Sequence, residues 1–217
     1  MISTYELSRV PLRCLFSTIG RVHAEGIGNV PREGGVVLVS NHLTMLDPPL
    51  LGALMPRQLH FMAKEELFRI PLLGWYLTHA GTFSIRRGEA DRHALRHAED
   101  LLRAGEIVMI FPEGHRSQAT GAREARSGAV MLATRTNSPI VPAAITGTEH
   151  LRLHRPFDQV ARGFLSRPRI SVTIGEPIRF TRGGGSAARK AGVDQLMRKI
   201  TALLPPEYHG IYAEGQA

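Results

Sequence analysis

Short apolar runs alternate with longer helical stretches along this chain, and the alternation restricts its possible folds more than any other feature. The apolar runs are rich in Val, Ile and Phe, and they predict strands at residues 35–39, 58–63, 81–87, 107–111, 140–145 and 169–174. Helical patterns cover residues 50–54, 64–68, 71–78, 89–104, 122–136 and 188–204. Strands that alternate with helices predict a layered α/β fold, with a mostly parallel central sheet flanked by helices.

Polar residues appear abruptly after the first of these predicted strands. His42 and Asp47 lie five residues apart, and Pro48 and Pro49 then favour the start of a helix. A neutral imidazole can accept a proton near pH 7, and a carboxylate that holds its other nitrogen stabilises the resulting imidazolium. The pair is therefore a candidate general base. The alternative is a histidine at a loop end beside an aspartate that caps the helix.

Composition suits one domain with an anionic partner. The 217 residues are 43% hydrophobic, and 27 Lys and Arg against 19 Asp and Glu give a net charge of +8. A phospholipid surface, a phosphorylated substrate or a nucleic acid would each fit this charge. No aromatic residues interleave with the basic ones, so we expect no nucleic-acid partner.

The sequence also predicts where the protein works. Cys14 is the single cysteine, which precludes an intrachain disulfide and favours a reducing compartment. No apolar run approaches the roughly 18 residues that a membrane-spanning helix needs, and no secretory signal is evident. We therefore expect a peripheral or monotopic protein on the cytoplasmic side of a membrane.

The N-terminal segment differs in character from the rest of the chain. Residues 4–20 mix apolar side chains with Glu6, Arg9 and Arg13, and Pro11 is expected to interrupt or start a helix there. One interpretation is an interfacial anchor within residues 1–25, with its arginines at lipid headgroups, followed by a single domain at 26–217. The other interpretation is a helix packed on the protein's own core.

Three further segments carry two interpretations each. Residues 71–78, which include Trp75, could line an acyl groove or belong to the core. His93 with His97, and His150 with His154, have the helical spacing of zinc ligands. No third ligand is evident near either pair and charged residues flank the first, so we expect solvated faces and no metal site.

Two later strands also end in polar residues. Arg87 closes the strand predicted at 81–87, and Arg116 follows the strand at 107–111; both are cations that could bind a charged headgroup without burial. Gly114 would let the backbone approach an anion closely. No G-x-S-x-G nucleophile motif is present, and Cys14 is distant in sequence from His42, so we expect no acyl-enzyme.

Together these blocks resemble the glycerolipid acyltransferase family. The resemblance runs in order from residue 41 to about residue 147. The matching residues are Asn41, His42, Thr44 and Asp47 in the first block, Gly81 and Arg87 in the second, Phe111, Pro112, Glu113, Gly114, Arg116 and Ser117 in the third, and Ile140, Val141 and Pro142 in the fourth. His115 stands where the family usually has Thr, a difference that bears on the identity of the acceptor.

The resemblance implies transfer of a fatty acyl group from acyl-CoA or acyl-carrier protein to the hydroxyl of a lysophospholipid, above all 1-acylglycerol-3-phosphate. In that scheme His42 is the base and Asp47 orients it, and no metal or cofactor takes part. The acceptor-binding residues would be Arg87, Glu113, Gly114, Arg116 and Ser117. Two alternatives stay open: a non-catalytic, basic protein that binds anionic lipid, and a hydrolase that uses the same pair on a thioester.

Overall fold

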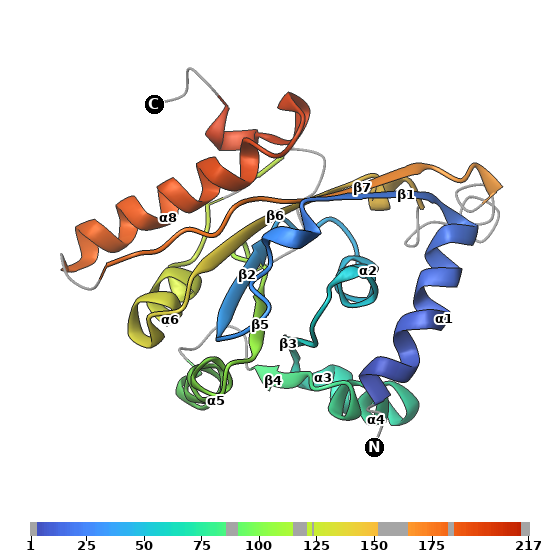
Figure 1. Ribbon diagram of the computed structural model, residues 1–217, viewed down its shortest axis with the longest axis horizontal. Helices are drawn as coiled ribbons and strands as arrows, with labels where there is room; N and C mark the ends of the chain where they lie inside the picture. The colour runs from blue at the N-terminus through green and yellow to red at the C-terminus, as the bar shows by residue number, and fades with distance from the viewer. Residues whose placement is uncertain are drawn as a thin grey trace.

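A seven-stranded sheet separates two layers of helices in the computed structural model (Figure 1). The structure describes residues 4–85, 91–114, 121–122, 124–151, 165–181 and 185–213. The strands are β1 (Arg21–Glu25), β2 (Val36–Ser40), β3 (Leu59–Lys64), β4 (Phe83–Ile85), β5 (Ile107–Ile110), β6 (Ile140–Thr146) and β7 (Arg169–Ile174). The α-helices are α1 (Thr4–Ile19), α2 (Asp47–Leu54), α3 (Glu65–Phe68), α4 (Pro71–His79), α5 (Arg92–Arg103), α6 (Gly128–Thr136) and α8 (Gly185–Thr201).

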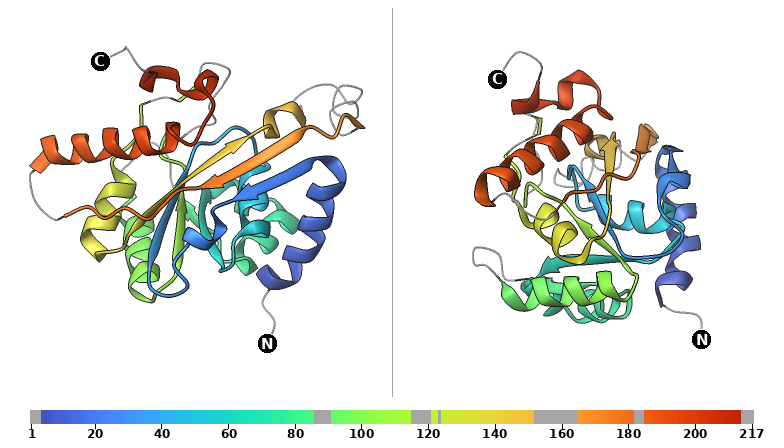
Figure 2. Two further views of the ribbon diagram at one scale, coloured as in Figure 1. Left: turned by 45° about the horizontal axis from the view of Figure 1, so that its top comes forward. Right: turned by 60° about the vertical axis from the view of Figure 1, so that its left-hand side comes forward.

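The two faces of the sheet bury separate hydrophobic cores. On β2, Val36 and Leu38 point to the core beneath α1 and α2, whereas Val37 and Val39 point to the core beneath α5, α6 and α8 (Figures 1 and 2). All four side chains are 0% exposed. Burial on both faces explains why this strand is a continuous apolar run and does not alternate with polar residues.

The sheet has the order β1-β7-β6-β2-β5-β3-β4. Among the described strands β6 and β7 pair antiparallel, and the other neighbours pair parallel. The predicted fold class is therefore confirmed. Because β2 lies between β5 and β6 and runs parallel to both, the loops that follow these three strands leave from the same edge.

Several predicted element boundaries are wrong. Strand β1 was missed because it lies at the edge of the sheet, is half exposed and carries Arg21, His23 and Glu25 in place of an apolar run. Helix α6 begins at Gly128 and not at residue 122. The N–H of Ala122 donates to the carbonyl of Tyr208, so that stretch satisfies its backbone outside a helix.

Two interruptions expected from glycine and proline are absent. Helix α1 continues through Pro11, so the expected break or start there is wrong. The Gly-Gly-Gly-Ser run at residues 183–186 also predicts a short flexible link. This prediction is wrong for Gly185 and Ser186, which are the first residues of α8, while 183–184 lie outside the described residues. In α1, packing against α2 and β1 outweighs the missing proline N–H.

Helix α1 is attached to the body of the protein by its arginines. The guanidinium of Arg9 donates to the carbonyl oxygen of Met55, and Nε of Arg13 donates to that of Ala53 at 2.6 Å. These carbonyls lie at the C-terminal end of α2, where cations complement the helix dipole. The guanidinium of Arg9 and Nε of Arg13 are thus bound within the protein, and the inner face of α1 packs on the protein's own core.

Candidate active site

His42 and Asp47 meet just beyond the C-terminal end of β2. Nδ1 of His42 lies 2.9 Å from Oδ2 of Asp47, the contact that the spacing predicts. The side chain of Asp47 is fully buried, and that of His42 is 12% exposed. Because an ionised carboxylate only accepts hydrogen bonds, a neutral imidazole at this position carries its proton on Nδ1 and its lone pair on Nε2. The imidazole is thus in the tautomer that a general base requires.

The Asp47 carboxylate does not cap the helix that it begins. Its Oδ2 accepts the backbone N–H groups of Leu43 at 2.6 Å and Thr44 at 2.8 Å, both of which precede α2. The N-cap position of α2 is Leu46, which makes no side-chain cap. The alternative reading of Asp47 as a helix cap is therefore wrong. The carboxylate instead organises the loop that carries His42.

The other oxygen of Asp47 is held by two hydroxyl groups. The hydroxyl of Thr44 donates to Oδ1 at 3.2 Å, and that of Thr148 donates to the same oxygen at 2.6 Å. Thr148 is 0% exposed and lies 101 residues from Asp47 in the sequence. It begins a 3-10 turn, η2 (Thr148–Leu151), just after β6. Both carboxylate oxygens are thus bound on several sides.

Aromatic packing fixes the plane of the imidazole. The rings of His42 and Phe111 are stacked with centroids 4.1 Å apart and an interplanar angle of 21°. Phe111 directly follows β5, whose Ile110 pairs with Val39 of β2. The first and third sequence blocks therefore come together at the sheet edge, as the strand order requires.

Asn41 connects the loop after β2 to β6, which flanks β2 on the side opposite to β5. Its Nδ2 donates to the carbonyl of Ile145 at 2.8 Å, and its Oδ1 accepts the N–H of Ile145 at 2.8 Å. The side chain is buried, so both polar atoms find partners without water. Asn41 thereby extends the pairing of β2 with β6 up to the residue before His42.

Of the predicted acceptor-binding residues, the structure describes Glu113 and Gly114. Glu113 is 5% exposed, and Gly114 has a left-handed backbone with φ of 69°. A Cβ at Gly114 would lie 3.3 Å from Nε of Arg126, which places this cation beside the turn. Arg87, Arg116 and Ser117 lie outside the described residues.

A tyrosine near the C-terminus contacts the segment that carries Thr148. The hydroxyl of Tyr208 donates to the carboxylate of Glu149. Burial, followed by this hydrogen bond to a carboxylate, raises the pKa of the Tyr208 phenol. The phenol therefore stays protonated and remains a donor at neutral pH.

The histidine pairs with zinc-like spacing do not form a cluster in the part of the chain that the structure describes. His93 and His97 are exposed on α5, and His97 makes an edge contact with Phe83. Within the described ranges, no group of three or more His, Cys, Asp or Glu side chains is arranged to hold a metal ion. His154, the partner proposed for His150, is not among them.

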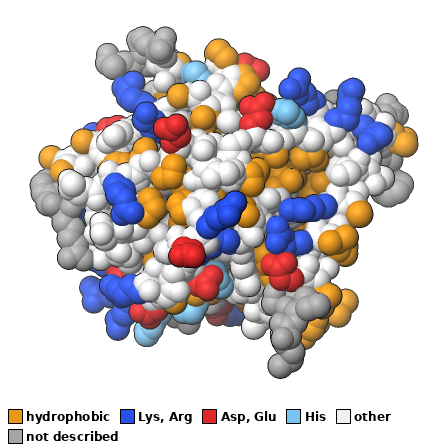
Figure 3. All heavy atoms as spheres, viewed as in Figure 1, with side chains coloured by type: hydrophobic (Ala, Val, Ile, Leu, Met, Phe, Trp, Pro, Cys, Tyr) orange, Lys and Arg blue, Asp and Glu red, His pale blue; other side chains and the backbone are white. Residues whose placement is uncertain are grey.

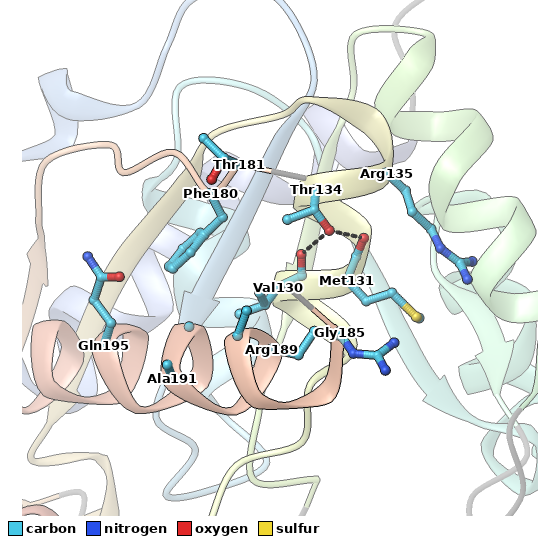
Figure 4. A pocket seen from close by; sticks show the side chains of 12 residues that line it. Val130, Met131, Thr134, Arg135, Phe180, Thr181, Gly185, Arg189, Ala191 and Gln195 are labelled. Carbon is cyan, nitrogen blue, oxygen red and sulfur yellow. Dashed lines mark hydrogen bonds between the residues drawn. The ribbon is translucent and has the colours of Figure 1, made fainter. Parts of the chain in front are cut away.

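A groove of about 560 Å³ lies between α6 and α8, away from these residues (Figure 4). Its walls include Met131, Phe180 and Gln195. The Thr134 hydroxyl on its edge already donates to the carbonyls of Val130 and Met131. The groove contains none of the predicted site residues.

Comparison with known proteins identifies the family to which this chain belongs. The profile of the family described as Acyltransferase matches residues 21–146, more than half of the chain. The chain belongs to the acyltransferase family. The matched range holds the His42–Asp47 pair, Phe111 and the predicted acceptor-binding residues, and the expectation of an O-acyltransferase is confirmed at the level of the family.

Individual relatives agree with this membership. The 1-acyl-sn-glycerol-3-phosphate acyltransferase of Bacillus subtilis is 29% identical over 80% of this chain and 82% of its own length. The protein of the same name from Streptococcus pneumoniae is 30% identical over 82% of this chain and 63% of its own length. The lyso-ornithine lipid O-acyltransferase of Pseudomonas aeruginosa is 38% identical over 55% of this chain and 45% of its own length.

A solved structure shares the fold of this family member. The crystal structure of PlsC from Thermotoga maritima, a 1-acyl-sn-glycerophosphate acyltransferase, superposes with a TM-score of 0.72. It is 26% identical in sequence and covers 92% of this chain and 79% of that chain. The layered α/β sheet is therefore the acyltransferase fold.

Sequence reasoning missed Thr148 and Arg126. Thr148 lies two residues after the end of β6, so the rule that located His42 could also have located it. Arg126 lies in the stretch that was predicted as helix, and nothing in the pattern indicated its place beside Gly114. It comes close to that glycine because its backbone N–H donates to the carbonyl of Pro112.

Proposed function

We propose that this protein transfers a fatty acyl group from a thioester to the hydroxyl of a lysophospholipid, with 1-acylglycerol-3-phosphate as the acceptor. The donor would be acyl-CoA or acyl-carrier protein. The observation that carries the proposal is the 2.9 Å contact between His42 Nδ1 and the buried Asp47 carboxylate, in a member of the acyltransferase family. Two relatives named for this acceptor support it.

In this mechanism His42 acts as a general base and no covalent acyl-enzyme forms. Nε2 takes the proton of the acceptor hydroxyl as its oxygen attacks the thioester carbonyl. The tetrahedral intermediate collapses to the new ester and expels the thiolate, which takes the proton back from the imidazolium. Asp47 stabilises that cation while it exists. Neither a metal nor a cofactor takes part, and the thioester is a co-substrate.

The second and third blocks would hold the acceptor headgroup. The family resemblance assigns Arg87, Glu113, Gly114, Arg116 and Ser117 to the acceptor, with the two arginines on its phosphate. The left-handed turn at Gly114 and the nearby guanidinium of Arg126 support an anion at this position. An arginine fork can bind two phosphate oxygens at once.

We also propose that the enzyme works at an anionic membrane surface. Helices α1 and α4 expose the apolar side chains of Leu7, Val10, Leu72 and Trp75, and we call these four side chains the α1/α4 apolar face. The two helices adjoin, since the Tyr76 hydroxyl donates to Oγ of Ser8 at 3.2 Å. Apolar and cationic side chains are interspersed on the side of the molecule that carries α1 (Figure 3).

The occupant of the face would be a bilayer, since the net charge of +8 complements anionic lipid. The core interpretation of residues 71–78 is wrong for Leu72, which is 85% exposed, and for Trp75, which is 57% exposed.

No helix among the described residues is long and apolar enough to cross a membrane. We place the enzyme on the cytoplasmic side, because the single cysteine suits a reducing compartment.

An acceptor screen tests the proposed reaction. The purified protein is given acyl-CoA or acyl-carrier protein with lysophosphatidic acid, other lysophospholipids or no acceptor, and products are measured by mass spectrometry. We expect an acylated product only when an acceptor is present, with lysophosphatidic acid preferred. Thioester loss at the same rate without acceptor would instead show a hydrolase. Vesicle binding without any turnover would show a non-catalytic lipid-binding protein.

One comparison favours a second acceptor. The Pseudomonas aeruginosa relative named for lyso-ornithine lipid has higher identity, 38%, than the two named for 1-acylglycerol-3-phosphate, although over a shorter range. His115 also replaces the usual threonine of the third block. Lyso-ornithine lipid therefore belongs in the screen, and preference for it would replace the phosphate-bearing acceptor while leaving the reaction class unchanged.

A further inference from the structure

We infer that Thr148 is a positioning residue for the His42–Asp47 pair. The inference rests on the proposed function, because it concerns how the base is held during acyl transfer. Thr148 lies outside the four sequence blocks and beyond the range that the family profile matches. It reaches the pair only through the fold, from the turn after β6.

The hydrogen bond from Thr148 is the shorter of the two hydroxyl contacts to Oδ1 of Asp47. The Thr148 bond measures 2.6 Å, and the Thr44 bond measures 3.2 Å. Thr148 and Asp47 are both 0% exposed, so water cannot replace the hydroxyl without a rearrangement. A buried carboxylate oxygen that loses its donor carries a larger free-energy cost than an exposed one.

The backbone around Thr148 leaves it little freedom. Gly147 has φ of 88°, and a Cβ at this position would lie 2.0 Å from the carbonyl oxygen of Arg169. Only glycine fits there, so the turn brings Thr148 to Asp47 in one way. Two residues earlier, Ile145 is held at both backbone groups by the buried amide of Asn41.

The two carboxylate oxygens of Asp47 have different side-chain partners. Oδ2 faces the imidazole, while the hydroxyls of Thr148 and Thr44 fix Oδ1 and thereby set the rotation of the carboxylate about its last bond. If the Thr148 hydroxyl is removed, Oδ1 keeps only the longer contact to Thr44, while the N–H groups of Leu43 and Thr44 still bind Oδ2. The carboxylate is then held less firmly against Nδ1 of His42. Turnover should fall, whereas groups that bind the acceptor stay in place.

The test compares Thr148→Val, which removes the hydroxyl at nearly constant volume, with Thr148→Ser, which keeps it. The matched control is Thr201→Val, because Thr201 is also buried but its hydroxyl donates to backbone carbonyls of its own helix. We expect Thr148→Val to lower kcat about ten- to a hundredfold with KM changed less than twofold. The serine variant and the control should retain most of the wild-type kcat.

Melting temperatures are recorded for every variant, and if Thr148→Val does not fold at the assay temperature, Thr148→Ala replaces it. A double-mutant cycle then separates positioning from general stability. If Thr148 acts through Asp47, Thr148→Val in an Asp47→Asn background should lower kcat less than twofold further. The same fold-loss in both backgrounds, or a wild-type kcat in the folded valine or alanine variant, would overturn the inference. A wild-type enzyme without acyl transfer would contradict the proposed function instead.

Discussion

At the scale of single residues, the His42 ring is held along its edge and across its face. Asp47 binds its Nδ1 at 2.9 Å, and Phe111 stacks against its plane with centroids 4.1 Å apart. A base positioned in this way keeps Nε2 directed at one place, and proton transfer depends on that geometry before it depends on pKa. We therefore expect the packing contact to contribute to turnover alongside the hydrogen bond.

Phe111→Leu tests the packing contact. We expect kcat to fall by up to about tenfold, since an aromatic pair contributes about 0.5–1.5 kcal/mol beyond simple burial. The control is Phe83→Leu, because Phe83 makes an aromatic contact of its own, with the exposed His97. Steady-state kinetics should show a larger loss for Phe111→Leu; equal losses in the two variants would mean that the stacking has no special role.

The residue-scale prediction from sequence succeeded for contacts within a block and failed for contacts between distant parts of the chain. His42 and Asp47 lie five residues apart at one strand end, so their spacing indicated the contact, with a helix-capping aspartate as the open alternative. Thr148 is 101 residues from Asp47, and only the parallel pairing of β6 with β2 brings the two together. The predicted roles of Arg87, Arg116 and Ser117 stay predictions, because these residues lie outside the described ranges.

At the scale of elements, most strands could be predicted because they are buried on both faces. A strand that is buried on both faces of the sheet is a continuous apolar run, as in β2 and β5. Strand β1 needs only one partner, β7, and its alternating polar residues give no such run. The inner contacts of α1 were likewise beyond sequence patterns, since its arginines bind carbonyls of α2.

An ion pair between helices gives an element-scale prediction. Glu99 of α5 accepts from Arg135 of α6 at 2.9 Å and from Arg103 at 3.0 Å. The hydrogen bond from Arg135 chiefly lowers the pKa of the Glu99 carboxyl from its ordinary value of 4.5. A lowered folded-state pKa means that the stabilisation is present above pH 4.5 and is lost as the pH falls through the lowered value.

Glu99→Gln should therefore reduce the free energy of unfolding by about 0.5–1 kcal/mol at pH 7. The difference between wild type and variant should shrink as the pH falls from 7 to 3. Urea denaturation followed by circular dichroism at several pH values measures it. A difference that is constant across this range would contradict an ionic contribution from Glu99.

At the scale of the whole molecule, the proposed site and the proposed membrane contact belong to one body of the protein. Helix α2 starts at Asp47, and its C-terminal end receives Arg9 and Arg13 from α1. A single helix thus links the catalytic loop to the helix that would lie on lipid. Residues 4–20 carried two separate interpretations, an anchor and a core helix, and the inner face of α1 fits the core interpretation.

Vesicle binding tests the α1/α4 apolar face. Leu72→Glu should weaken binding to vesicles of anionic phospholipid about tenfold or more, because it replaces an apolar contact with the bilayer by a carboxylate that anionic lipid repels. Trp75 is the only tryptophan, so its fluorescence should shift to the blue when wild-type protein binds. Ile211→Glu is the control, since Ile211 is 52% exposed and lies outside that face. Equal weakening by both substitutions would contradict the assignment.

The central claim is that His42 removes the proton of the acceptor hydroxyl. The most direct measurement is the rate of acyl transfer to the preferred acceptor by wild type and by His42→Ala, with matched circular dichroism spectra. We predict a loss of about 10²–10⁴-fold in kcat for the variant. A folded His42→Ala protein that acylates its acceptor at nearly the wild-type rate would contradict the account.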